Sequence, residues 1–282
     1  MVSSGIKYLH RAALLGLAVM VATTVAARAQ DIRQQLSSSS VIEEVKKRGV
    51  LRIGLSTFVP WSMRDKKGDL IGFEIDVGNR VAGDMGVKAE FVPTAWDGII
   101  PALIAGKFDV IISGMSITPQ RNLTVNFTIP YAHSGQQMAA NKQLAGGFTS
   151  LDQFNDPSVI ITCRRGTSTC VSALKVFPKA TQRQFDDEAQ CLQEVLNGNA
   201  YAVVTSAPKP QMWTLDHPDV LFMPTDENLT KSDEAFAVRK GDPDAINFFD
   251  NWILFNASNG WIEERHDYWF KGNTWKDQVA TN

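Results

Sequence analysis

The feature that most constrains the fold of this chain is a strand–helix alternation that occurs twice along it. Short apolar runs, typical of buried strands, alternate with segments whose apolar residues recur at helical spacing. One series runs from Val41 to Ile112 and the other from Ser158 to Val204, with a break at Gly146-Gly147 between them. Such alternation favours parallel α/β units with crossover helices. The sequence therefore predicts two α/β lobes of roughly a hundred residues each.

The amino terminus has the layout of a secretory signal. Basic residues precede an apolar run over 12–27, and Ala27-Arg28-Ala29 has the small-x-small form of a cleavage site. The run is too short, and wrongly flanked, for a stable membrane span. We therefore expect residues 1–29 to be a signal peptide and residues 30–40 to be a flexible leader. Because no later apolar run reaches spanning length, we expect an exported chain that is not embedded in the membrane.

Composition argues against several classes of function. The formal net charge is −2 and charged residues make up 21% of the chain, so the sequence offers no basic footprint for nucleic acid. The four histidines are scattered, and the spacing of the three cysteines fits no zinc pattern. We therefore expect no metal, no other cofactor and no nucleic-acid partner.

The three cysteines, Cys163, Cys170 and Cys191, fall in one third of the chain. In an oxidising compartment they permit one disulfide and leave one thiol over. We predict a Cys170–Cys191 disulfide between the starts of neighbouring helices in the second lobe, with Cys163 buried and free. Because a sequence cannot specify such a pairing, three reduced thiols are the alternative.

Small polar residues follow two of the predicted strands. In open α/β sheets ligands bind beyond the carboxyl ends of the strands, where Ser113-Gly114-Met115-Ser116 and residues 164–169 lie. Such loops present free backbone N–H groups, and a helix start adds partial positive charge, so they suit an anion. Arg121 adds a planar fork of donors that matches a carboxylate. Each feature alone fits a surface turn or a solvated ion pair, but together they favour a carboxylate site between the lobes.

Three aromatic residues stand after predicted strands. Such residues belong more often to the core of a lobe than to a ligand wall. Phe58 and Trp96 each precede polar or turn residues, where a flat ring would cover the apolar part of a ligand. We therefore expect Phe58 and Trp96 to contact the ligand and Trp61 to pack inside its lobe.

Four segments of the chain are similar to a known family. In order they read GVLRIGLSTFVPW, GDLIGFEIDVGNRVAGDMG, WDGIIPALIAGKFDVIISGMSITPQR and FTIPY. Their Gly-Phe-x-x-Asp and Ser-Gly-x-x-x-Thr-x-x-Arg strings resemble those of the family 3 periplasmic solute-binding proteins, the polar amino acid receptors of ABC importers. The resemblance implies a monomer that captures a small-molecule ligand in the periplasm and delivers it to the permease of an ABC importer.

The resemblance also implies the fold, which is the type II two-lobed periplasmic binding protein fold. In it, two α/β lobes are joined by two hinge crossings. Lobe 1 would comprise residues 41–137 and 234–282, the latter with the C-terminal helices, and lobe 2 would comprise residues 138–233. The crossings would lie near residues 135–141 and 231–237. A ligand that contacts both lobes would favour the closed state by its extra contacts.

The family's site residues carry over position by position. Arg121 matches the family arginine that grips the ligand α-carboxylate. The loop that supplies polar groups is matched by Ser113, Gly114 and Ser116, and the two flat walls are matched by Phe58 and Trp96. The second-lobe loop that closes on the carboxylate is matched by Arg164, Thr167 and Ser168.

Two departures from the family pattern bear on the ligand. Ser206 stands where amino acid receptors carry an aspartate for the ligand ammonium, and Leu55-Ser56-Thr57 lacks the aspartate often found after the first strand. A buried ammonium without a carboxylate partner is costly. Arg164, Arg165 and Lys209 also bring positive charge to this region. The ligand is therefore either a carboxylate without a free amine or an amino acid with an acidic side chain.

Two alternative functions are consistent with the same fold. A cyclohexadienyl dehydratase shares it, but that chemistry needs a carboxylic acid in the cleft to protonate the leaving hydroxyl. Lys209 stands at the expected acidic position, and the sequence offers no obvious substitute, so we favour a binding protein that is not an enzyme. The second alternative is the ligand-binding component of a sensory system, which a soluble binder could serve.

Overall fold

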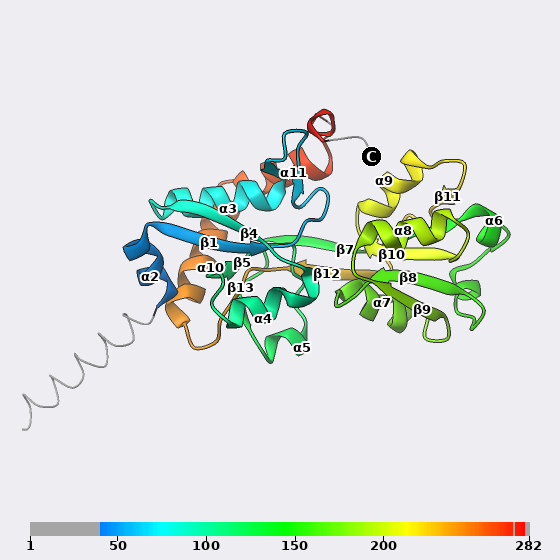
Figure 1. The fold of residues 1–282 in the computed structure, drawn as a ribbon, viewed down its shortest axis with the longest axis horizontal. Helices are drawn as coiled ribbons and strands as arrows, with labels where there is room; N and C mark the ends of the chain where they lie inside the picture. Colours follow the sequence, from blue (N-terminus) through cyan, green and yellow to red (C-terminus); the bar gives the residue numbers. More distant parts are fainter. Residues whose placement is uncertain (1–39, 273, 280–282) are drawn as a thin grey trace, which may run out of the picture.

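The structure is a computed structural model that describes residues 40–272 and 274–279. Two main β-sheets, each covered by helices, form two lobes that lie side by side in Figure 1. The chain therefore has the two-lobed α/β architecture that the sequence predicts. The predicted signal peptide, residues 1–29, and all of the predicted leader except Ser40 lie outside the described residues.

The sheet of lobe 1 has the strand order β4-β1-β5-β13-β6. Strand β1 pairs in parallel with both β4 and β5, whereas β13 runs antiparallel to β5 and β6. Strand β13 comes from the late part of the chain, so the C-terminal segment returns to lobe 1. The strands are β1 (Val50–Leu55), β4 (Lys88–Pro93), β5 (Val110–Ile111), β6 (Asn126–Phe127) and β13 (Ala237–Val238), and a separate hairpin joins β2 (Met63–Arg64) to β3 (Leu70–Ile71).

Helices cover this sheet and bury its apolar side chains. Phe73, Phe236 and Phe249 are fully buried in the largest apolar cluster, to which the C-terminal helices contribute. That cluster explains why the late Trp- and Phe-rich segment belongs to lobe 1. The helices are α2 (Val41–Arg48), α3 (Phe73–Asp84), η1 (Trp96–Gly98), α4 (Ile99–Ile104), α5 (Pro119–Asn122), α10 (Pro243–Ser258), α11 (Trp261–Phe270) and η3 (Lys276–Gln278).

The sheet of lobe 2 has the strand order β11-β7-β10-β8-β9, and β12 pairs with β7 beside it. Strand β8 lies parallel to β9 and β10, as expected for a crossover unit. Its strands are β7 (Ala132–Asn141), β8 (Ile160–Arg164), β9 (Thr181–Phe185), β10 (Ala202–Ser206), β11 (Leu221–Phe222) and β12 (Thr230–Glu234). Its helices are α6 (Lys142–Ala145), η2 (Leu151–Phe154), α7 (Ser168–Val176), α8 (Glu188–Leu196) and α9 (Lys209–Asp216).

Two strands connect the lobes. Strands β7 and β12 pair antiparallel from Ala132 opposite Glu234 to Gln136 opposite Thr230, and in Figure 1 they run side by side from one lobe to the other. Hinges between domains lie at the few residues that connect them. The two crossings that the sequence predicts overlap β7 and the segment from β12 to β13.

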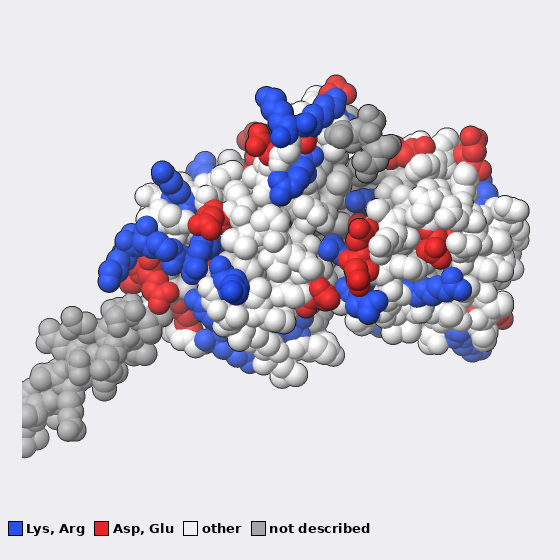
Figure 2. Space-filling view, viewed as in Figure 1, with Lys and Arg blue, Asp and Glu red and all other residues white. Residues whose placement is uncertain are grey.

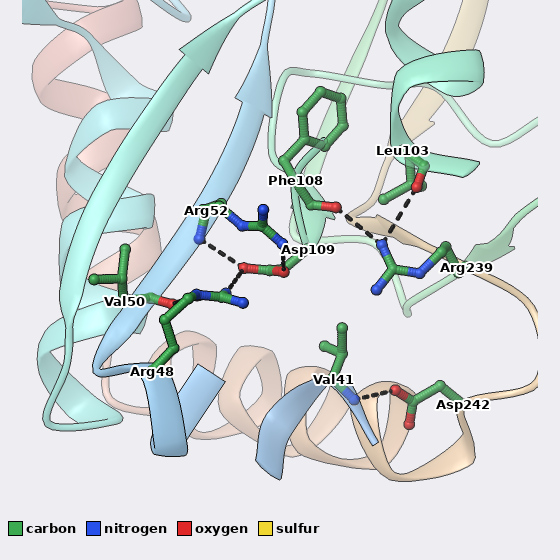
Figure 3. Close-up of polar contacts among 9 residues, drawn as sticks. All are labelled: Val41, Arg48, Val50, Arg52, Leu103, Phe108, Asp109, Arg239 and Asp242. Atoms are coloured by element: carbon green, nitrogen blue, oxygen red, sulfur yellow. Dashed lines mark hydrogen bonds and ion pairs between the residues drawn. The ribbon is translucent and has the colours of Figure 1, made fainter. Parts of the chain in front are cut away.

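A buried acid joins three elements of lobe 1 (Figure 3). The side chain of Asp109 is fully buried just before β5 and forms ion pairs with Arg48, at the end of α2, and with Arg52 in β1. One of its oxygens also accepts a hydrogen bond from the Arg52 amide at 2.8 Å. Two guanidinium groups and one amide therefore compensate the charge that burial would otherwise make costly.

The disulfide prediction is wrong. The structure pairs Cys163 with Cys170, whose Cα atoms are 5.3 Å apart, and leaves Cys191 as a buried free thiol. Strand β8 continues to Arg164, so Cys163 lies within the strand. Successive residues of a strand point to opposite faces. The Thr162 hydroxyl bonds to the Cys191 carbonyl oxygen on the α8 side, which leaves Cys163 facing α7 and Cys170.

Two general properties of the described chain concern membranes and charge. Across residues 40–272 and 274–279, none of the helices combines the length and apolar character that crossing a membrane requires. On the face shown in Figure 2, acidic and basic side chains are interspersed among uncharged ones. This face therefore has the mixed charge of an ordinary protein surface.

Candidate functional site

A cavity lies between the two lobes, and its walls come from both. About 390 Å³ between these walls is free of protein atoms, a volume that includes space open to solvent. Every residue that the sequence predicts as a ligand contact lines this cavity except Arg121, and Thr169 and Glu188 line it in addition. The lining residues are Phe58, Trp96, Ser113, Gly114, Ser116, Arg164, Thr167, Ser168, Thr169, Glu188 and Ser206.

The loop after β5 forms the lobe 1 wall. Ser113 Oγ accepts a hydrogen bond from the Ser56 amide at 2.9 Å, which ties the loop to the end of β1. Gly114 has a φ of 55°, a left-handed conformation that glycine adopts without strain, and a Cβ there would come within 3.0 Å of the Trp61 ring. The Gly114 amide donates to Glu74 Oε1 at 2.7 Å. Buried partners thus hold the loop in one conformation.

One buried carboxyl group lies behind this loop, and a second lies where the two strands cross between the lobes. Burial raises the pKa of Glu74 to about 8, although hydrogen bonds from Tyr131 and Gly114 oppose the rise. Burial likewise raises the pKa of Glu234, at the end of β12, to about 7. Glu234 Oε1 accepts hydrogen bonds from Ser232 and Ser134. One carboxyl group therefore supports the binding loop, and the other lies where the crossing strands pair.

The start of α7 and the loop before it form the lobe 2 wall. Helix α7 begins at Ser168, and the amides of a first helical turn have no partners within their own helix. These amides, with the hydroxyls of Ser168 and Thr169, lie at the partly positive end of the helix dipole. Gly166, with a φ of 72°, allows the turn from β8 into the helix. This wall therefore suits a carboxylate.

The predicted aromatic walls are present. Trp96 Nε1 donates to the Gly166 carbonyl oxygen across the lobes at 3.1 Å. Phe58 lines the cavity, with the ammonium of Lys209 5.3 Å from its ring centroid. Trp61 instead packs edge-on against Phe73 in the lobe 1 core, as the sequence predicts. Two flat rings thus border the cavity, and both lie close to cationic groups.

The Arg121 guanidinium lies beside the cavity rather than in its lining. Its Nη1 donates to the Ser116 carbonyl oxygen at 2.8 Å, and its Nη2 donates to the Gly166 carbonyl oxygen at 3.2 Å. Thr118 caps the short helix α5 that carries it. No acidic side chain within residues 40–272 and 274–279 forms an ion pair with Arg121. Burial therefore lowers the pKa of Arg121 to about 10.

Direct hydrogen bonds join the lobes around the cavity. Arg164 Nη2 donates to Ser56 Oγ at 2.8 Å, and Ser116 Oγ lies 3.1 Å from Ser168 Oγ. With the contacts of Trp96 and Arg121 to Gly166, these bonds hold the two walls together. The structure therefore has a closed arrangement of the lobes.

Glu188 is the site residue that the sequence analysis missed. The expectation that no acid lies near Lys209 is wrong, because Glu188 Oε2 is 3.5 Å from Lys209 Nζ and lines the cavity. The Thr205 hydroxyl donates to the other carboxylate oxygen of Glu188. Asp186-Asp187-Glu188 follows β9, so a signal was available: a run of three acidic residues at a strand end, where the other site loops also lie.

No group of side chains suited to hold a metal ion occurs within the described residues. The cavity instead gathers hydroxyls, free amides, one guanidinium group and one carboxylate. Such a set can bind and orient a small polar ligand by hydrogen bonds and charge.

Comparison with known proteins places this architecture in a family. The L-cystine-binding protein of Escherichia coli is 27% identical over 279 residues, 96% of this chain and 99% of that protein. The cyclohexadienyl dehydratase of Pseudomonas aeruginosa is 24% identical over 236 residues, 83% of this chain and 88% of that protein.

A solved structure gives the same picture. The binding component of an ABC transporter from Wolinella succinogenes, described as putative and complexed with lysine, is 37% identical with a TM-score of 0.76. The match covers 82% of this chain and 99% of that one. Residues 51–272 of this chain match the bacterial extracellular solute-binding proteins, family 3. The chain is therefore a member of the family 3 solute-binding proteins and has their two-lobed type II fold.

Proposed function

We propose that this protein captures a small carboxylate-bearing solute, an amino acid or a related organic acid, outside the cytoplasm and delivers it to an ABC importer. The observation that carries the proposal is Arg121, a half-buried cation with no acidic partner among the described residues, beside a cavity between two lobes. A desolvated guanidinium is stabilised by a carboxylate that binds it in bidentate geometry. Relatives that bind cystine or lysine support an amino acid as the ligand.

In this proposal the ligand carboxylate lies between Arg121 and the start of α7. Arg121 would exchange its hydrogen bond to the Gly166 carbonyl oxygen for one to the ligand. The hydroxyls and amides of Ser168 and Thr169 would complete the cradle, with Ser113, Gly114 and Ser116 on the opposite wall. Phe58 and Trp96 would enclose the apolar part of the ligand.

The lobes would close on the ligand by bending of β7 and β12, with lobe 2 spanning residues 138–233 and lobe 1 the remainder. A ligand that bridges the two walls favours the closed state because it binds that state more tightly. Small-angle scattering with and without ligand measures this change. We expect a smaller radius of gyration with ligand; an unchanged radius would contradict hinge closure.

A thermal-shift screen tests the proposed function. Amino acids, 2-oxo acids and dicarboxylates, together with amines and sugars that lack a carboxylate, are added singly to the purified protein, and the unfolding temperature is recorded. A ligand at a hundred times its Kd stabilises the folded state by about 2.7 kcal/mol, which gives a clear shift. We expect at least one carboxylate to produce it. A screen in which only compounds without a carboxylate stabilise the protein would refute the proposal.

Catalysis is the second candidate, because Glu188 is an acid in the cavity and a cyclohexadienyl dehydratase is among the relatives. A dehydratase would need this carboxyl group to protonate a leaving hydroxyl. We favour binding without turnover, because the relatives described as binding cystine and lysine are 27% and 37% identical to this chain, against 24% for the dehydratase. Incubation with a cyclohexadienyl carboxylic acid, followed by ultraviolet absorbance of an aromatic product, separates the two. Product formation above the Glu188→Gln background would establish the enzyme.

A further inference from the structure

We propose that the ligand is an amino dicarboxylic acid of the aspartate or glutamate type. Glu188 would bind its ammonium, and Arg164 with Lys209 would bind its side-chain carboxylate. This inference rests on the proposed function, because it takes the α-carboxylate to lie between Arg121 and the start of α7. It decides between the two ligand classes that the sequence leaves open.

The first observation is an unused acceptor on Glu188. Its Oε1 accepts a hydrogen bond from the Thr205 hydroxyl, whereas its Oε2 is buried and has no hydrogen-bond partner among the described residues. The ammonium of Lys209 is 3.5 Å from Oε2, farther than the roughly 2.8 Å of a charge-assisted hydrogen bond. A buried carboxylate oxygen without a donor is costly, and a ligand ammonium in the cavity would supply one. Glu188 can thus take the role that Ser206 lacks the charge to fill.

The second observation is the balance of charge around the cavity. Among the described residues the cations at the site are Arg121, Arg164 and Lys209, and the acid is Glu188, which leaves +3 − 1 = +2. Arg64 and Asp187, which line only the second cavity described below, have opposite charges and leave this balance at +2. Neither guanidinium pairs with an acidic side chain in the part of the chain that the structure describes. Two unpaired guanidinium groups and one unused carboxylate oxygen match a ligand with two carboxylates and one ammonium.

The same balance argues against a cationic ligand. An amino acid with a cationic side chain would raise the net charge of the site from +2 to +3, whereas an amino dicarboxylate would lower it to +1. Like charges in a water-excluded cleft are costly. The relative solved with lysine shows that other members accept a cation. In this chain the side-chain ammonium of lysine would approach Lys209 and Arg164.

The third observation is a second cavity that shares a wall with the first. Phe58, Arg164 and Glu188 line both cavities, and Lys209 lines only the second. The Lys209 ammonium lies 5.3 Å from the Phe58 ring centroid and 5.4 Å from that of Trp213, which places it over this wall. A ligand side chain that runs along Phe58 toward the second cavity would therefore end beside Lys209 and Arg164.

Calorimetric titration of the wild-type protein tests the ligand class directly. The probes are L-glutamate, L-aspartate, L-glutamine, L-asparagine, L-lysine, L-arginine and 2-oxoglutarate. We expect glutamate or aspartate to bind at least tenfold more tightly than its own amide and than either cationic amino acid. We also expect glutamate to bind at least tenfold more tightly than 2-oxoglutarate. An amide or a cationic amino acid that binds as tightly would overturn the inference. Equal binding of 2-oxoglutarate and glutamate would overturn the role of Glu188.

Two variants assign the roles. Lys209→Met should reduce the preference for glutamate over glutamine at least threefold, and Glu188→Gln should reduce the preference for glutamate over 2-oxoglutarate by as much. Glu194→Gln, at the far end of α8, and Lys175→Met, exposed on α7, are the matched controls and should change neither ratio. Unchanged ratios in the site variants would refute the assignment.

Because Glu188 and Lys209 pair with each other, either single variant leaves an uncompensated charge. If one fails to fold, the double variant Glu188→Gln, Lys209→Met removes both charges and should lose both preferences while it still binds a carboxylate. Failure of this inference is distinct from failure of the proposed function. Glutamine that binds more tightly than glutamate, with dependence on Arg121, overturns the inference alone. Absence of any carboxylate ligand overturns both.

Discussion

The carboxyl group of Glu74 accepts a hydrogen bond from the Gly114 amide at 2.7 Å, which joins a fully buried acid to the loop that lines the cavity. The Tyr131 hydroxyl donates to the same oxygen. Burial raises the pKa of Glu74 from 4.5 to about 8, so the folded protein holds this group protonated at neutral pH. The loop that lines the cavity is therefore held by the carboxyl group of Glu74, whose ionised form is disfavoured by burial.

The first prediction concerns pH. A pKa raised in the folded state means that Glu74 contributes most to stability below pH 4.5, and that this contribution declines as pH rises to about 8. Glu74→Gln, which cannot ionise, should flatten the fall in unfolding temperature over this range. Thermal unfolding at pH 5, 6, 7 and 8 measures the difference. Parallel profiles for the variant and the wild type would show that Glu74 ionises freely in the folded protein.

The second prediction concerns Arg121. Replacement by alanine removes the guanidinium that we assign to the ligand carboxylate. We expect a loss of about 2–5 kcal/mol in binding free energy, upwards of roughly thirtyfold in Kd, with little loss of folding stability. Titration with the ligand found in the screen measures it. Arg165→Ala is the control, because Arg165 is exposed and pairs with Asp186. Wild-type affinity in Arg121→Ala would end the site assignment.

The third prediction concerns Asp109, which compensates Arg48 and Arg52 (Figure 3). Asp109→Ala leaves two guanidinium groups and the Arg52 amide without this acceptor, so we expect a loss of about 3 kcal/mol in the free energy of unfolding. Urea denaturation measures it. Glu43→Ala breaks an exposed pair with Lys46 and should cost about 0.5 kcal/mol or less. Similar losses of unfolding free energy in Asp109→Ala and Glu43→Ala would contradict the expectation that a buried ion pair is costlier to break than an exposed one.

The fourth prediction concerns the cysteines. Peptide mapping of the unreduced protein should recover a bridge between Cys163 and Cys170. Burial raises the pKa of Cys191 to about 12, so its thiol should react with iodoacetamide only after denaturation. Mass spectrometry of labelled native and denatured protein measures both. Rapid labelling of Cys191 in the native protein, or a bridge that includes it, would contradict this arrangement.

Much of the fold and of the candidate site could be predicted because the signals are local in the chain. Strand and helix periods gave the two α/β lobes, and small polar residues after the strands gave both walls of the cavity. Ser113 and Ser168 are examples: Ser113 comes two residues after β5 and Ser168 begins α7, so the place of each at a sheet edge follows from chain order. The resemblance to the family motifs added the prediction that these loops surround one ligand.

Tertiary structure alone decided two features. Glu188 reaches the cavity because parallel pairing of β9 with β8 places the start of α8 beside Lys209. Cys163 pairs with Cys170 because the continuation of β8 turns that side chain toward α7. Contacts of this kind join residues from different elements, and they depend on strand register and on which face a side chain takes. A register shift of one residue turns a side chain to the opposite face of the sheet. The local periodicity of a sequence does not specify strand ends to within one residue.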